Sequence, residues 1–314
     1  DFRPLVFGAA FIAAAVADIL ARFIGGQSPV FSVPSYVIPP LSTLPTFAVL
    51  GLIAGLLGVM FNRSLLLALK LSGRLNGRNA LIAAALVGAG AGLVAWFTPV
   101  ASGSGHDLTE TALIGEVALS AIPFWFLLRF VLTIASYGSG APGGIFAPLL
   151  VLGSLVGLAV GKVAYLMAPL AAPEPAVFAV VGMAAMFTAI VRAPLTGIVL
   201  ILEMTGNYNQ MLPLLVSCFC AYVAAEFLND LPIYEALLAR DLSRTGASHV
   251  LEEPAVLELD VEPQSLFVGR RINQLGLPAG MLIVRVRDGS REWVPTAVTY
   301  LEPHMKITVV IAPE

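Results

Sequence analysis

The feature that most constrains this chain is a glycine- and proline-rich stretch between two long apolar runs. It extends from Gly138 to Pro148 and reads GSGAPGGIFAP, and no charged residue occurs from Phe130 to Gly161. Glycine and proline break helices, and irregular backbone at membrane depth is tolerated only where protein covers it or where it lines a wet cavity. A helical pattern resumes after Pro148, so a helix N-terminus lies here, with free N–H groups and a partial positive charge. The stretch therefore predicts an anion site at a broken membrane helix.

The composition is that of a polytopic membrane protein. Hydrophobic residues make up 58% of the 314 residues and charged residues 12%, and the mean hydropathy is +0.89. Soluble domains carry about 25% charged residues. The net charge of −3 gives no reason to expect a nucleic-acid partner. Cys218 and Cys220 lie at i and i+2 of one apolar segment, where they point to different faces and are expected to be unbridged core residues.

Charged residues divide the chain into two regions. Residues 1–240 hold 20 of the 37 charged residues, and residues 241–314 hold the other 17. We therefore expect a transmembrane domain at 1–245, a linker at 246–255 and a small cytoplasmic α+β domain at 256–314. The sequence begins at Asp1 and enters its first apolar segment almost at once, so we expect it to lack the N-terminal part of a longer protein.

Apolar segments predict the membrane helices. Gly51, Gly55 and Gly58 lie on the second of them, where small residues let helices approach closely. Four basic residues between positions 63 and 78 predict a cytoplasmic loop. Two of the segments are short and interrupted, as in transporters whose binding site lies at mid-membrane. The predicted helices, short ones included, are Leu5–Ile24, Thr46–Leu71, Ala80–Thr98, Thr109–Glu116, Ile122–Tyr137, Val177–Phe187, Ala193–Leu202, Met204–Ala225 and Ile233–Leu242.

The C-terminal region has the alternating pattern of β-strands. Strands are predicted at Val256–Val261, Leu282–Arg287 and Lys306–Ile311. Asp288-Gly289 is a hairpin turn signal, and Gly269–Leu277 is predicted to be a short helix.

These motifs resemble the CLC family of chloride channels and chloride/proton antiporters. Residues 138–161 are similar to the second signature of that family, and the resemblance covers about residues 1–245. It implies the second half of an inverted helical repeat in a membrane. Further matching motifs are Ile190–Gly197, Leu202–Tyr208 and Leu231–Tyr234. The tail resembles the TrkA-C (RCK C-terminal) fold, on Val268-Gly269, Arg287–Gly289 and Pro295.

The resemblance implies a chloride site and names its residues. The backbone N–H groups of Ile145 and Phe146 would hold the ion, together with the Tyr234 hydroxyl. Backbone amides bind an anion weakly enough for it to leave, whereas a cationic side chain at the ion would trap it. The resemblance implies no cofactor and no metal. The supporting backbone residues are Gly143, Gly144 and Pro148.

Two further family motifs are missing from the chain. A G-S-G-I-P signature and a G-x-E-G-P stretch with a gating glutamate do not occur in it. We therefore expect that this chain does not conduct alone. Whether the whole protein is a channel or an antiporter stays open, and so does the anion that it selects. The resemblance implies a homodimer in the cell membrane, with interface helices at Leu5–Ile24, in part of Thr46–Leu71 and within residues 193–228.

Other interpretations remain beside this one. Phe146 could be a buried aromatic, and Tyr234 could anchor a helix at the membrane interface. The roles of Arg129 and Glu226 stay open, with structural pairing favoured. In a second functional class, residues 256–314 would bind a ligand or a twin domain and regulate the pore. An enzyme is not expected, since Ser104 and His106 have no positioned partner, and His249 and His304 lack metal-ligand spacing.

Overall fold

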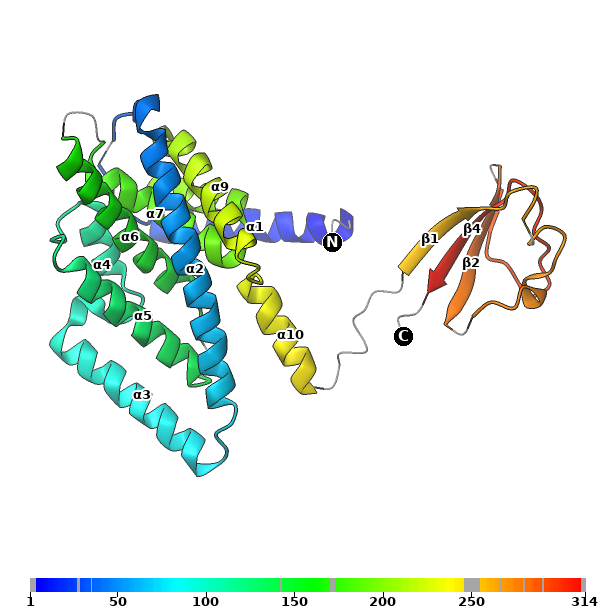
Figure 1. The fold of residues 1–314 in the computed structure, drawn as a ribbon, viewed down its shortest axis with the longest axis horizontal. Helices are drawn as coiled ribbons and strands as arrows, with labels where there is room; N and C mark the ends of the chain where they lie inside the picture. The colour runs from blue at the N-terminus through cyan, green and yellow to red at the C-terminus, as the bar shows by residue number, and fades with distance from the viewer. Residues whose placement is uncertain are drawn as a thin grey trace. The chain divides into compact units, whose positions relative to one another are not determined.

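The computed structural model describes residues 4–26, 29–34, 36–141, 143–169, 173–245, 255–265, 267–278, 280–289 and 291–311 (Figure 1). The chain divides into two compact units, residues 1–236 and 237–314. All but one residue of the predicted linker, and with it His249, lie outside the described residues.

The first unit is helical. Among the described residues, five helical segments are long and apolar enough to cross a membrane: 8–25, 41–72, 78–97, 146–167 and 208–227. The α-helices are α1 (Pro4–Gly25), α2 (Leu44–Ser72), α3 (Arg78–Phe97), α4 (His106–Leu113), α5 (Ile122–Gly138), α6 (Phe146–Met167), α7 (Pro175–Val191), α8 (Pro194–Thr205), α9 (Met211–Phe227) and α10 (Ile233–Thr245), the last of which continues into the second unit. Short 3-10 turns are η1 (Leu41–Thr43), η2 (Pro99–Ala101) and η3 (Tyr208–Gln210).

Helix α7 lies at the centre of this unit, because every residue from Ala176 to Ile190 is buried. It packs against α6, α2 and α9, and α2 also contacts α5 and α9 (Figure 1). The glycines of α2 make these contacts close, as predicted. A Cβ added to Gly55 would lie 2.6 Å from Cβ of Ala224 on α9, and one added to Gly58 would lie 2.6 Å from Cβ of Ala189 on α7.

In this first unit, the predicted segments Met204–Ala225 and Val177–Phe187 differ from the structure. The predicted helix Met204–Ala225 is wrong at its start, because Gly206 ends α8 there. Gly206 has φ +64° and its N–H donates to the Leu202 carbonyl at 2.8 Å, a left-handed helix end that glycine adopts without strain. Helix α7 is longer than the predicted Val177–Phe187, since Pro175 can start a helix at its first position.

The second unit contains a four-stranded sheet in the order β1-β4-β2-β3, with every pair antiparallel. The strands are β1 (Ala255–Asp260), β2 (Met281–Asp288), β3 (Arg291–Trp293) and β4 (Lys306–Ile311). The predicted hairpin is confirmed, because Asp288 pairs with Arg291. The helix predicted at Gly269–Leu277 is wrong: only a 3-10 turn, η5 (Ile272–Gln274), forms between glycines with positive φ at 269 and 276. The strands share a buried core that includes Ile283, Val286, Ile307 and Val309.

Candidate functional site: the N-terminus of α6

The glycine-rich stretch connects α5 to α6. Helix α5 ends at Gly138, and α6 begins at Phe146, three residues before the helical pattern that resumes after Pro148. Pro148 therefore lies in the first turn of α6, where the missing N–H of proline costs nothing. Gly140 has φ +82°, a left-handed conformation that glycine adopts readily. The break in the helix, and a helix N-terminus at its end, are confirmed.

Ile145 and Phe146 form the start of α6. The Ile145 carbonyl accepts the first helical hydrogen bond, from the Leu149 N–H at 3.0 Å. None of the described residues accepts a hydrogen bond from the N–H of Ile145 or Phe146. The Ile145 side chain is buried, and the Phe146 ring meets the Phe187 ring of α7 edge to face at a centroid distance of 5.9 Å. The side chains thus pack into the protein while the backbone amides remain available.

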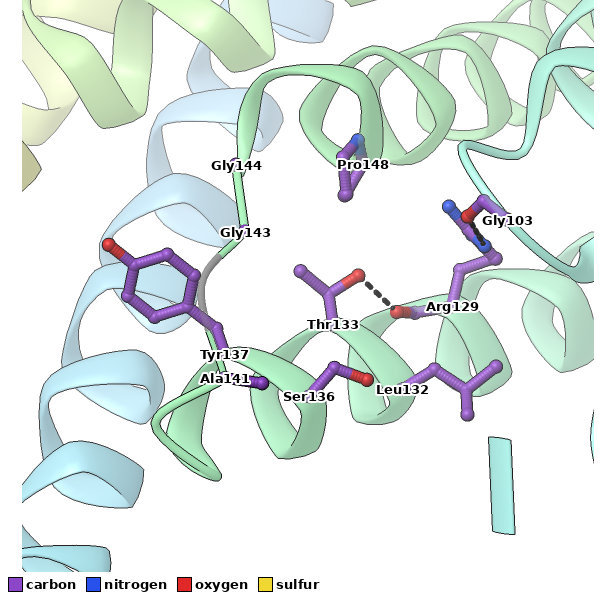
Figure 2. Close-up of a pocket in the computed structure, with 10 residues that line it drawn as sticks. All are labelled: Gly103, Arg129, Leu132, Thr133, Ser136, Tyr137, Ala141, Gly143, Gly144 and Pro148. Atoms are coloured by element: carbon purple, nitrogen blue, oxygen red, sulfur yellow. Dashed lines mark hydrogen bonds between the residues drawn. The ribbon is translucent and has the colours of Figure 1, made fainter. Parts of the chain in front are cut away.

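A cavity of about 220 Å³ lies beside this helix start. Figure 2 shows Gly143, Gly144 and Pro148 on one side of it, with Arg129 and Thr133 rising from α5 on the other. Among the described residues its lining contains no carboxylate. The lining residues are Gly103, Arg129, Leu132, Thr133, Ser136, Tyr137, Ala141, Gly143, Gly144 and Pro148.

Arg129 brings a buried positive charge to this cavity. Arg129 is buried, with only 4% of the residue exposed. Its Nη1 donates to the carbonyls of Ala101 at 2.7 Å and Gly103 at 3.1 Å, and its Nη2 donates to that of Ser104 at 2.9 Å. Within the described chain, no carboxylate lies at ion-pair distance from Arg129 and its buried Nε has no hydrogen-bond partner. A guanidinium, a hydroxyl and a helix N-terminus around one hollow favour an anion.

The structural pairing favoured for Arg129 is therefore made with loop carbonyls rather than with a carboxylate. One signal in the sequence pointed to this residue: Arg129 is the only charged residue between Glu116 and Lys162. Structural pairing is also found for Glu226, since its Oε2 lies 3.7 Å from Nε of Arg192.

The predicted site residues are only partly brought together. Gly143, Gly144 and Pro148 line the cavity, whereas Ile145, Phe146 and Tyr234 are not among its described lining residues. Tyr234 is the second residue of α10 and is 52% exposed, beside the fully buried Ile233. The assignment of Ile145, Phe146 and Tyr234 to one chloride site stays a prediction.

No group of three or more His, Cys, Asp or Glu side chains is placed to hold a metal ion in the part of the chain that the structure describes. The His106 ring stacks on Phe31 at a centroid distance of 4.9 Å.

Comparisons with known proteins agree on one family. A sequence model of the voltage gated chloride channel family matches residues 1–226. The H(+)/Cl(−) exchange transporter ClcA of Vibrio parahaemolyticus is 42% identical over 237 residues, which are 74% of this chain and 51% of that protein. The ClcA of Vibrio cholerae is 39% identical over 260 residues, 82% of this chain and 54% of that protein.

Solved structures give the same result. A slow cyanobacterial Cl−/H+ antiporter matches with a TM-score of 0.71 and 40% identity, covering 74% of this chain and 55% of that one. The chain thus spans about half the length of the relatives it matches.

Proposed function

Because this chain belongs to the voltage gated chloride channel family, we propose that the protein transports chloride across a membrane in exchange for protons. The relatives named as H(+)/Cl(−) exchange transporters support antiport rather than a passive channel. The observation that carries the proposal is the start of α6, where free backbone amides lie next to a cavity with a buried guanidinium and no carboxylate among the described lining residues.

The proposed chloride ligands are the N–H groups of Ile145 and Phe146 and the hydroxyl of Tyr234. Neutral donors at a helix N-terminus stabilise an anion without the full charge that would hold it too tightly for transport. The adjacent Arg129 guanidinium is fixed by three carbonyls, so it contributes positive potential without moving onto the ion. Gly143, Gly144 and Pro148 support the backbone that presents the amides.

Removal of a single hydroxyl tests this site. The full-length protein is reconstituted in liposomes, and chloride efflux, accompanying proton movement and the chloride/nitrate selectivity are measured. Tyr234→Phe should lower the selectivity about fivefold, the equivalent of one hydrogen bond of about 1 kcal/mol. Tyr165→Phe is the matched control, since that tyrosine is 45% exposed on α6, at the end away from the proposed site. Equal selectivity in Tyr234→Phe and the control would remove Tyr234 from the site, and chloride efflux without proton movement would rule out exchange.

A regulatory role for the C-terminal region is the second candidate function. Its support is that residues 237–314 form a compact unit whose sheet has its own buried core. We propose the boundaries 1–245, 246–255 and 256–314, with the last part a cytoplasmic TrkA-C-like domain. Deletion of residues 246–314 should change the transport rate or its dependence on conditions while chloride transport persists. An unchanged rate under all conditions would contradict this role.

We propose also that the protein is a homodimer in the cell membrane. The support is the apolar surface of α1, α8 and α9, where Phe23 is 87% exposed, Leu195 72% and Phe219 66%. A lipid environment would cover such residues as well. Cross-linking through a single cysteine, placed at position 195 or at position 219 in a variant without Cys218 and Cys220, distinguishes the two, because only a dimer joins two chains at one specific position.

A further inference from the structure

The connection between α9 and α10 is held by side chains from two other helices. It consists of Leu228 to Pro232, and Tyr234 follows two residues later. Its Asp230 side chain is only 6% exposed although it carries a charge. A buried carboxylate needs partners, because transfer from water is costly for an unpaired charge.

Three side chains supply those partners. The Asn62 Nδ2 of α2 donates to Asp230 Oδ2 at 2.8 Å. The Arg63 Nε of α2 lies 3.7 Å from Asp230 Oδ1, and the Arg192 Nη2 at the end of α7 lies 4.0 Å from Oδ2. Glu226 also pairs with Arg192, so two arginines face two carboxylates and the cluster is balanced in charge.

The same three side chains bind the backbone of the connection. Arg63 Nη2 donates to the Leu228 carbonyl at 3.0 Å, and Arg192 Nη2 donates to the Asp230 carbonyl at 2.9 Å. Asn62 Nδ2 also donates to the Leu231 carbonyl, at 3.3 Å. Between these points Asn229 has φ +48°, a left-handed conformation that asparagine tolerates better than most residues. The path of the connection is therefore fixed on both sides of Asn229.

Close packing of α2 and α7 brings this cluster together. Gly58 lies one turn before Asn62, and a Cβ there would lie 2.6 Å from that of Ala189. Arg192 follows three residues after Ala189, with φ +63° at the end of α7, and its Nη1 donates to the Ala189 carbonyl. Helix α10 then starts with the Ala236 N–H donating to the Pro232 carbonyl at 3.0 Å.

From these contacts we propose that Asp230 is a positioning residue: its carboxylate, held by Asn62, Arg63 and Arg192, fixes the first turn of α10 and thereby places the Tyr234 hydroxyl. The role in transport depends on the proposed function, in which that hydroxyl contacts chloride. The role in fixing α10 does not, so the two parts are tested separately.

Hydrogen exchange of the full-length protein tests the structural part. In Asp230→Asn the charge that holds two arginines is lost, and the amides of residues 234–238 should exchange about tenfold faster than in the wild type. Asp260→Asn is the matched control, because that aspartate is exposed and pairs with Lys306 in the sheet. Arg63→Gln changes a side chain that is 62% exposed, so it should accelerate hydrogen exchange at residues 234–238 by less. This variant replaces Asp230→Asn in the test if Asp230→Asn does not fold. Unchanged exchange at 234–238 in the folded variants would overturn the proposal.

Selectivity measurements test the link to Tyr234. Asp230→Asn should lower the chloride/nitrate selectivity about threefold, and Asp230→Glu, which keeps the charge, should restore part of it. When combined with Tyr234→Phe, Asp230→Asn should add little, since both changes would act on one hydroxyl. Additive effects, or full selectivity in Asp230→Asn, would overturn the positioning of Tyr234. An unaltered selectivity in Tyr234→Phe alone would instead remove Tyr234 from the proposed chloride site, while the hydrogen-exchange result still decides whether Asp230 fixes α10.

Discussion

Helices α3 and α6 are alike in composition and length, but α6 is closely packed and α3 is not. Both are apolar, long enough to cross a membrane and carry three glycines. In α6, a Cβ added to Gly153 would lie 2.5 Å from the Gly182 carbonyl oxygen, and one added to Gly161 would lie 2.7 Å from the Pro175 carbonyl oxygen. A Cβ added to any of the three glycines of α3 would meet nothing within 4 Å. None of the α3 residues, all of which the structure describes, is buried.

The two helices differ in the spacing of their glycines. In α6 they follow one another at intervals of four, at 153, 157 and 161, which places them on one face and lets α7 approach. In α3 they occur at 88, 90 and 92, so only Gly88 and Gly92 share a face, Gly90 lies on another, and no row of three glycines forms. Glycine content therefore does not indicate close packing unless it forms a stripe. The predictions below compare packed with open positions, beginning with this pair.

The largest effect is expected at Gly157 of α6. A Cβ there would overlap the Phe178 carbonyl of α7, so Gly157→Ala should force the two helices apart and lower the free energy of unfolding by about 3 kcal/mol or more. Gly90→Ala in α3 is the control, and its greater helix propensity should raise stability by up to about 1 kcal/mol. Thermal unfolding in detergent measures both. Similar losses in the two variants would mean that packing does not distinguish these helices.

A buried charge provides the next comparison. Arg129→Lys keeps the charge but replaces a planar fork that binds three loop carbonyls with a single ammonium group. We expect a loss of about 2 kcal/mol in unfolding free energy, typical of broken hydrogen bonds to a charged group. Arg22→Lys, at an exposed residue paired with Asp18 on α1, should change stability by less than about 0.5 kcal/mol. An equal, small effect at both positions would show that the loop at 101–104 does not need the guanidinium.

The sequence predicted the break at 138–148 and most helices because both depend on local residue types. Glycine and proline interrupt helices, and Pro148 lies close to the observed start of α6. The prediction of one helix at Met204–Ala225 failed because the apolar composition continues through a turn. One glycine in the left-handed conformation, Gly206, makes that turn.

The surroundings of the candidate site could not be predicted in the same way. Arg129 contacts carbonyls 25 to 28 residues earlier in the chain, and Asp230 contacts Asn62 across 168 positions. No local pattern encodes such distant partners. A lone charge in a long apolar run, as at Arg129, marks a residue that needs partners without saying which they are.

A buried hydroxyl in the loop before α2 should have a smaller effect. Tyr36 is 2% exposed and its hydroxyl donates to the Leu113 carbonyl at 2.6 Å, so Tyr36→Phe should cost about 1 kcal/mol. Burial, and secondly the charge of Glu174, raises the pKa of Tyr36. The folded state thus keeps this phenol neutral while the unfolded state ionises near pH 10, so its contribution is complete below about pH 10 and is lost as the pH rises further.

Alkaline unfolding measures this effect. The free energy of unfolding of the wild type should fall more steeply above about pH 10 than that of Tyr36→Phe. Parallel alkaline curves for wild type and Tyr36→Phe would show that Tyr36 does not titrate differently in the folded state.

The smallest effect is expected on the open face of the sheet in the second unit. Arg285 donates to Glu258 at 2.5 Å and to Glu292 at 3.0 Å, which is closer than either arginine approaches Asp230. These groups are 42% to 62% exposed, so water and salt screen them and Arg285→Ala should cost less than about 1 kcal/mol, and less still at high salt. Chemical unfolding of the full-length protein, followed by the Trp293 signal of this sheet, measures the loss at low and high salt. The short but exposed ion pairs of Arg285 should thus contribute less to stability than the longer, buried contacts of Asp230. A loss above 2 kcal/mol in Arg285→Ala that persists at high salt would reverse that order.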